Sequence, residues 1–295
     1  MVRSELEHGQ APWKHAAISG WILDPDRKKM SKSKGNVVVP NEILETHGSD
    51  AVRYWAASAR LGTDAAFDEG QMKIGRRLAI KLLNAARFAL SFELPAGVTA
   101  VTEPIDKSML ASLQEVIAGS TEAFEGYDHT KALEKAESFF WTFTDDYLEL
   151  VKERAYGQGD FTEQEKGSAV IALRQALGVL VRLFAPFIPF AAEEVWSWWQ
   201  DGTVHKSSWP TSGEISGEDA GLMILASAAL VQIRKSKSDN KLSMKAEIAT
   251  ALVSGPVAMQ SMAKDLAAVG HIAELNFKEA KEVSVTDLKF QPDQD

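Results

Sequence analysis

Residues 129–156, HTKALEKAESFFWTFTDDYLELVKERAY, decide the fold class of this chain. Apolar side chains recur at spacings of three and four residues along one stripe, namely Leu133, Ala136, Phe140, Phe143, Tyr147 and Leu150. Acidic side chains occupy the opposite face. This is the pattern of an amphipathic α-helix. The stretch therefore predicts one long helix whose apolar stripe packs into a helical core.

The same periodicity continues on both sides of this helix. It predicts further helices over 71–94, 106–126 and 163–185. Pro186 and Pro189 then break the chain before a short helix in AAEEVWSWW. Because short connections favour antiparallel neighbours, we expect a helical bundle over residues 71–215.

The two ends of the chain depart from this pattern. The apolar run HAAISGWIL, residues 15–23, predicts a buried strand. Pro40 and Gly48 bound a predicted short helix, and Ser49-Asp50 is predicted to cap the next one. From residue 216 helices and strands alternate, which predicts a small α/β unit over 216–290, followed by a frayed tail over 291–295. The fold class expected is mainly α.

The composition narrows the functional classes. The chain has 295 residues, 45% of them hydrophobic, a formal net charge of −9 and no cysteine. Disulfides, thiolate metal sites and cysteine nucleophiles are therefore excluded. No signal peptide is recognisable, and no apolar run approaches the roughly 20 residues of a membrane span. We expect a cytoplasmic protein that does not contact membranes.

One predicted loop is strongly basic, although the chain as a whole is acidic. The stretch DPDRKKMSKSKGNVV, residues 24–38, carries five basic side chains between Arg27 and Lys34 and no acidic one among them. Ammonium groups suit polyphosphate, serine hydroxyls can donate to phosphoryl oxygens, and Gly35 allows the backbone to change shape. The stretch predicts a loop that clamps a triphosphate, with Lys32 as the main candidate. The alternative is a solvated basic surface loop.

The string KMSKS, residues 29–33, matches a signature of the class I aminoacyl-tRNA synthetases without a change. Other segments extend the resemblance: GSDAVRYWAAS, GTDAAFDEGQMKIGRRLAIKLLNAARFAL, DDYLELVKERAY and RLFAPFIPFAAEEVW. Together they resemble the C-terminal part of the bacterial valyl-tRNA synthetases. Leucyl and isoleucyl enzymes share the signature, but GTD followed by FD, and GRRLAIKLLNA, favour the valine family.

The resemblance implies an activity and a domain order. The family activates valine with ATP and transfers it to tRNA(Val). The resemblance also implies an ATP site at Lys29, Met30, Ser31, Lys32 and Ser33. In this site Lys29 and Lys32 would contact the phosphates, and Mg²⁺ would be carried by the nucleotide. Residues 1–36 would end a class I nucleotide-binding α/β domain. Residues 37–70 would contact the tRNA stem, 71–215 would bind the anticodon, and 216–290 would be an appendage.

The second catalytic motif of the family, His-x-Gly-His, is not found among the six histidines. We therefore expect that this chain alone does not catalyse the reaction. Two alternatives are a stand-alone tRNA-binding paralogue and one chain of a split synthetase. A third alternative is a helical scaffold with a vestigial loop.

Two groups of cations are candidates for tRNA contacts. The first lies opposite the apolar stripe of the helix over 71–94 and comprises Lys73, Arg76, Arg77 and Lys81. The second lies in IRKSKSDNKLSMK, interpreted as a flexible basic connector, and comprises Arg234, Lys235 and Lys237. Such side chains can hold phosphates without reading sequence. The alternative for both groups is a solvated surface.

The tryptophan cluster offers a further hypothesis. Trp196, Trp198 and Trp199 cannot all face one side of a helix, so at least one is expected at the surface, where it could stack on a base. Core packing of Trp196 and Trp199 is the favoured interpretation. The histidines lack carboxylates at ligand spacing, so no metal site is predicted. A monomer is expected.

Overall fold

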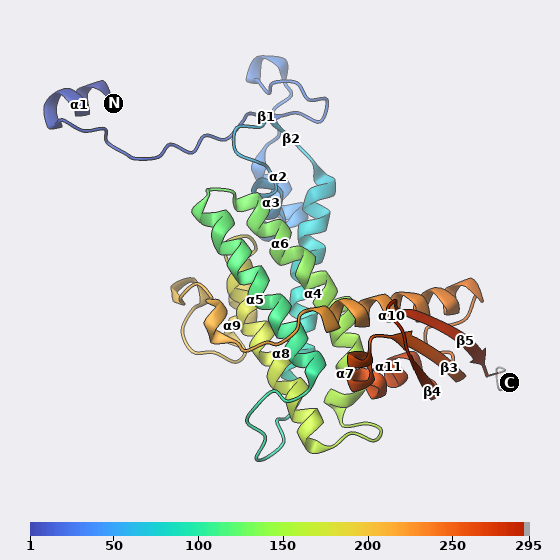
Figure 1. Ribbon diagram of the computed structural model, residues 1–295. Helices are drawn as coiled ribbons and strands as arrows, with labels where there is room; N and C mark the ends of the chain where they lie inside the picture. Colours follow the sequence, from blue (N-terminus) through green and yellow to red (C-terminus); the bar gives the residue numbers. More distant parts are fainter. Residues whose placement is uncertain (292–295) are drawn as a thin grey trace.

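The computed structural model describes residues 1–291 and has a central antiparallel helical bundle (Figure 1). Its helices are α4 (Glu69–Leu90), α5 (Pro104–Glu125), α6 (His129–Thr142), α7 (Leu148–Tyr156) and α8 (Glu163–Phe184). Helix α8 is long and apolar enough to cross a membrane, but 72% of its apolar window is buried within the bundle. It is therefore the core helix. The predicted, mainly helical architecture is confirmed.

Local capping side chains mark the start of three bundle helices, α4, α6 and α8. The side chain of Asp68 accepts hydrogen bonds from the backbone of Gly70 and Gln71 at the start of α4. Thr162 and Glu165 form a reciprocal capping box at the start of α8. Such caps satisfy backbone donors that have no partner inside the helix. These caps explain why α4, α6 and α8 begin within a few residues of their predicted starts.

The predicted single helix over 129–156 is wrong in one detail. A π-helical turn over Phe143–Tyr147 separates α6 from α7. The rings of Phe143 and Tyr147 are both buried and stack with their centroids 5.8 Å apart. The hydroxyl of Tyr147 donates to Asp106 on α5 at 2.8 Å. The stack lies within the turn, and the bond to Asp106 ties the turn to α5. Together they hold the wider turn, which a 3.6-residue periodicity cannot show.

The N-terminal region differs from the expected buried strand. Helix α1 (Val2–His8) buries no residue and lies far from the bundle (Figure 1). Of the run 15–23, only β1 (Ile22–Leu23) forms a strand, paired in parallel with β2 (Ala65–Ala66). Ile18 is 73% exposed. The apolar run lacks a covering layer among the described residues, so it remains at the surface.

Two short helices join this region to the bundle. They are α2 (Pro40–His47) and α3 (Ser49–Ala57), which confirms the predicted helix between Pro40 and Gly48. The predicted cap of α3 by Ser49-Asp50 is wrong, because Gly48 occupies the cap position. Asp50 instead accepts from the backbone of Phe190 and Ala191, at 3.0 and 2.8 Å, and caps α9 (Pro189–Ser197). A contact across 140 residues replaces the local one.

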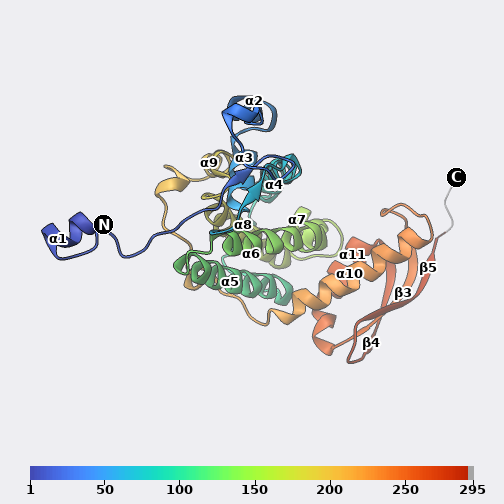
Figure 2. The ribbon, with the colours of Figure 1, turned by 90° about the horizontal axis from the view of Figure 1, so that it is seen from above.

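The C-terminal unit lies to one side of the bundle, away from α1 (Figure 2). Its elements are α10 (Gly221–Asp239), β3 (Ile248–Gly255), α11 (Ala263–Gly270), β4 (Ile272–Glu279) and β5 (Ser284–Phe290). The strand order is β4-β3-β5, with β3 parallel to β4 and antiparallel to β5. The predicted tail over 291–295 lies outside the described residues except for Gln291.

A buried ion cluster joins this unit to the bundle. Arg154 on α7 donates to both carboxylate oxygens of Asp106 on α5, at 2.8 and 2.9 Å. Its Nε donates to Asp265 on α11 at 2.9 Å. One guanidinium therefore faces two carboxylates in a site closed to water. Burial, opposed only in part by Arg154, raises the pKa of Asp265 to about 6.

This raised pKa predicts a pH-dependent difference between the protein and its Asp265→Asn variant. An acid whose folded pKa exceeds its ordinary 3.8 binds its proton more tightly when folded. The contribution of Asp265 to stability therefore falls as pH rises from about 4 to about 6, by roughly 3 kcal/mol for two units. Asparagine does not titrate and still accepts from Arg154. Urea unfolding at several pH values should show the variant gaining stability relative to the parent over this window, and a constant difference would contradict the prediction.

Candidate functional site

The basic loop begins at a narrow hairpin. Leu23 pairs with Lys29 in an antiparallel bridge, and Asp24 accepts from the backbone N–H of Lys28 at 2.7 Å. The backbone N–H of Asp24 in turn donates to the carbonyl of Lys28 at 2.9 Å. The hairpin brings the two ends of the turn together and presents residues 29–36 beyond it.

The five residues predicted to hold ATP lie together on this loop. Lys32 begins a short 3₁₀ turn that ends at Gly35, whose φ of +66° is readily adopted by glycine. The hydroxyls of Ser31 and Ser33 are 3.2 Å apart. Met30 is half-buried, whereas Lys29 and Lys32 are exposed. Two cations and two hydroxyls thus share one small surface.

The lysines of the loop are free of carboxylates. None of the ion pairs formed by the described residues includes Lys29, Lys32 or Lys34, although Lys28 lies 3.4 Å from Asp26. The Nζ atom of Lys29 lies 4.3 Å from the centre of the Trp21 ring, at cation–π distance. Exposed, unpaired ammonium groups beside hydroxyls fit the phosphates of a nucleotide, so the chemistry of the donor set agrees with an ATP-phosphate site.

The first predicted group of tRNA-contacting cations forms one face of α4. Lys73 is exposed, and Arg76 donates to the carbonyl of Thr46 at 3.1 Å. Arg77 lies 5.3 Å from the ring centre of Trp141. Lys81 pairs with Asp145 at 2.8 Å, so part of its charge is already compensated.

Arg87 continues this face and was not predicted from the sequence. It is exposed and lies 5.4 Å from the ring centre of Trp198. The sequence did contain a signal for Arg87: it follows Arg76 by eleven residues, close to three helical turns, so the two side chains lie on the same face of the helix. The three tryptophans of the cluster are all half-buried, so neither full exposure nor full core packing describes them.

The second predicted group of cations is largely structural, which corrects the interpretation of a flexible connector. Helix α10 extends through this run to Asp239. Lys237 is only 1% exposed and donates to the carbonyls of Met244 and Gly270, at 2.8 and 2.9 Å, while burial lowers its pKa. Arg234 pairs with Asp146 at 2.7 Å. Of this group only Lys235 is exposed, and the reason is that the helix turns the other two toward neighbouring elements.

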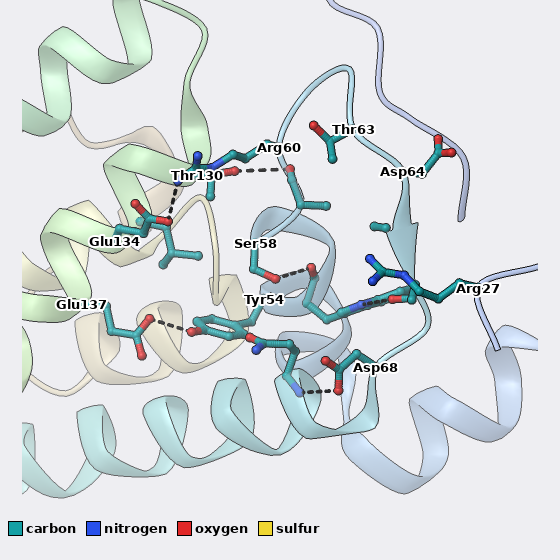
Figure 3. A pocket seen from close by; sticks show the side chains of 16 residues that line it. Arg27, Tyr54, Ser58, Arg60, Thr63, Asp64, Asp68, Thr130, Glu134 and Glu137 are labelled. Carbon is teal, nitrogen blue, oxygen red and sulfur yellow. Dashed lines mark hydrogen bonds and ion pairs between the residues drawn. The ribbon is translucent and has the colours of Figure 1, made fainter. Parts of the chain in front are cut away.

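A cavity of about 520 Å³ lies between the N-terminal region and the bundle (Figure 3). The hydroxyl of Tyr54 donates to Glu137 at 2.6 Å across it, and burial followed by this bond raises the pKa of Tyr54. Glu134 pairs with Arg60 at 3.4 Å, so these carboxylates are engaged. The cavity belongs to the joint between α3, α4 and α6.

Two family models match separate parts of the chain. Residues 1–68 match the family model described as tRNA synthetases class I (I, L, M and V). Residues 106–252 match the anticodon-binding domain of tRNA ligase. The chain is 55% identical over 300 residues to a valine–tRNA ligase of Leifsonia xyli subsp. xyli, covering 98% of this chain and 34% of that one. The chain belongs to the class I aminoacyl-tRNA synthetases.

Two further comparisons concern a second valine–tRNA ligase and one solved structure. A valine–tRNA ligase of Thermobifida fusca is 56% identical over 302 residues, covering 99% of this chain and 34% of that one. The chain thus spans about a third of the length of the curated relatives it matches. The LeuRS of Agrobacterium radiobacter K84, solved in a ternary complex with tRNA and LeuAMS, aligns over 66% of this chain and 24% of that chain, with 23% identity and a TM-score of 0.49.

Proposed function

We propose that this chain is the part of a valine–tRNA ligase that supplies the KMSKS loop and the surface for the anticodon arm of tRNA(Val). The complete enzyme would activate valine with ATP, release pyrophosphate and transfer valine to the tRNA in the cytoplasm, as a monomer. The observation that carries the proposal is the exposed, carboxylate-free KMSKS loop joined to an anticodon-binding bundle in one chain.

The loop would act on the phosphates of ATP, which arrives with its own Mg²⁺. Lys29 and Lys32 would hold the phosphates that leave as pyrophosphate, and the hydroxyls of Ser31 and Ser33 would donate to phosphoryl oxygens. Half-buried Met30 would anchor the loop between them. Charge on the departing group grows in the transition state, so cations aimed at it raise the rate more than the affinity for ATP.

The surroundings of the loop support the view that the chain does not catalyse alone. Large apolar side chains beside it are exposed, among them Trp21, Ile22, Val37 and Val39. Exposed apolar clusters of this kind mark interfaces. We infer that another part of the enzyme covers them and supplies the valine pocket and the other half of the ATP site.

The exposed face of α4 is the proposed track for the tRNA backbone. From Lys73 to Arg87 it spans about 21 Å at 1.5 Å per residue, long enough to meet several phosphates. Helix α4 carries no acidic residue beyond Glu69 at its start. Trp141 and Trp198 lie against this face, and their rings could contact an unstacked base. On the C-terminal unit, Lys235 is the remaining candidate.

Filter binding of tRNA(Val) tests this function. At about 150 mM salt we expect weak binding, with a Kd above about 1 μM, because most of the contact surface of a full-length enzyme is absent. A tRNA(Val) with a swapped anticodon should bind at least about tenfold more weakly. Lys73→Ala with Arg77→Ala should lower affinity and reduce the slope of log Kd against log salt by about two, one for each phosphate that the variant no longer neutralises.

Lys131→Ala is the matched control, since it removes an exposed lysine from the neighbouring helix α6 and should leave the salt slope unchanged. Equal binding of both tRNAs would point to non-specific electrostatic contact. No binding at all would favour the helical scaffold.

A further inference from the structure

Asn36, at the far end of the KMSKS loop, is hydrogen-bonded to three parts of the loop at once. Its Nδ2 donates to Asp24 Oδ2 at 2.8 Å and to the carbonyl of Lys29 at 3.3 Å. Its Oδ1 accepts from the backbone N–H of Ser31 at 2.9 Å. One side-chain amide therefore fixes the backbone on both sides of Met30. Lys32 follows directly after the fixed segment.

Asp24 holds this amide in place. Asp24 as a whole residue is only 6% exposed, and its two carboxylate oxygens accept from Asn36 and from the backbone of Lys28. These hydrogen bonds, the one from Asn36 first, lower the pKa of Asp24 and keep it ionised. A hydrogen bond to a charged acceptor is stronger than one between neutral groups. The amide is thus oriented with its donors toward Asp24 and Lys29, which leaves its oxygen for Ser31.

The loop needs such a constraint because its own charges oppose order. Lys29, Lys32 and Lys34 repel one another, and none has a carboxylate partner among the ion pairs of the described residues. Gly35, in the left-handed region, turns the chain back so that Asn36 can reach Ser31.

We propose that Asn36, oriented by Asp24, is a positioning residue that aims Lys29 and Lys32 at the phosphates of ATP. This inference rests on the proposed function. Asn36 itself touches no phosphate; it sets the backbone from which the two lysines extend. The backbone hydrogen bonds beyond Met30, between Ser31 and Lys34 and between Lys32 and Gly35, close only local turns.

Two NMR measurements on the 295-residue chain test this role. Amide hydrogen exchange of Ser31 reports directly on its hydrogen bond to Asn36. Titration with inorganic tripolyphosphate measures the affinity that Lys29 and Lys32 give the loop for phosphates. In Asn36→Ala we expect Ser31 to lose at least about tenfold of its protection and the affinity for tripolyphosphate to fall at least about tenfold. Asn36→Asp should lose more of both the Ser31 protection and the tripolyphosphate affinity, because it places a second carboxylate next to that of Asp24.

The exchanged pair, Asp24→Asn with Asn36→Asp, provides the rescue. The new amide at position 24 can donate to the new carboxylate at 36, which can still accept from Ser31, so affinity should recover most of the loss of Asn36→Asp. Asn41→Ala, which removes an exposed amide from α2, is the matched control and should change neither reading.

The outcomes separate this inference from the function on which it rests. Unchanged exchange of Ser31 in Asn36→Ala would overturn the positioning role. Lost protection with unchanged tripolyphosphate affinity would overturn it as well, because Asn36 would then order the loop without aiming the lysines. If the parent chain binds no tripolyphosphate while Ser31 is protected through Asn36, the phosphate role of the loop fails, and the positioning role fails with it.

Discussion

Replacing Arg154 with methionine is expected to lower the free energy of unfolding by about 3–5 kcal/mol, the cost of breaking a buried ion pair by removing one partner. The guanidinium is 1% exposed and compensates Asp106 and Asp265, which are also buried. Methionine fills similar space but leaves both carboxylates without a cation. Tyr147 and Ser168 also donate to Asp106, so the buried network would remain only partly satisfied. Urea unfolding followed by tryptophan fluorescence measures the loss.

Lys152→Met is the matched control for this prediction. Lys152 lies two residues earlier on α7, and its pair with Glu149 at 3.3 Å is exposed on both sides. Exposed pairs contribute at most about 1 kcal/mol, so this variant should unfold nearly as the parent does. Adding Asp106→Asn and Asp265→Asn to Arg154→Met removes the orphaned charges and should restore part of the stability. Similar losses for Arg154→Met and Lys152→Met would show that the cluster is not a stabilising joint.

The helical part of the fold was predictable because its causes are local. The stripe from Leu133 to Leu150 and the capping residues Asp68 and Thr162 lie within the elements that they specify. The loop motif is likewise contiguous, so its five residues had to lie together. Local sequence therefore determined the elements and brought the phosphate-binding candidates onto one surface.

What the sequence could not show depends on contacts that exist only once the chain is folded. Lys237 appears as one more cation in a basic run, and only the packing of α10 against α11 reveals that it is buried. Asp50 caps a helix 140 residues away, and the π turn at Phe143–Tyr147 is held by stacking and by Asp106. Asn36 shows no functional signal by composition; its role emerges from three distances. These features arise from tertiary geometry, which the periodicity of a sequence does not encode.

Lys32→Ala is expected to slow valine-dependent ATP–pyrophosphate exchange by about 10²-fold or more, the loss typical for removing one preorganised donor from a developing charge. The measurement requires a complete enzyme, such as the Thermobifida fusca valine–tRNA ligase with this chain in place of the matching third. Because Lys32 is exposed and unpaired here, its removal should not disturb the fold. We expect kcat to fall more than KM for ATP rises, since the charge met by Lys32 grows in the transition state.

Two controls test whether the effect of Lys32→Ala is specific to Lys32 and to the complete enzyme. Lys34→Ala removes a lysine from the same 3₁₀ turn but outside the five signature residues, and it should cost much less, because only a directed ammonium group stabilises the leaving phosphates. The isolated 295-residue chain should show no valine-dependent exchange, and tRNA affinity should not respond to Lys32→Ala. Equal exchange rates for the Lys32→Ala and parent enzymes would remove the loop from the mechanism. A loss equal to that of Lys34→Ala would reduce its role to general positive charge, because the two lysines differ in direction and not in charge.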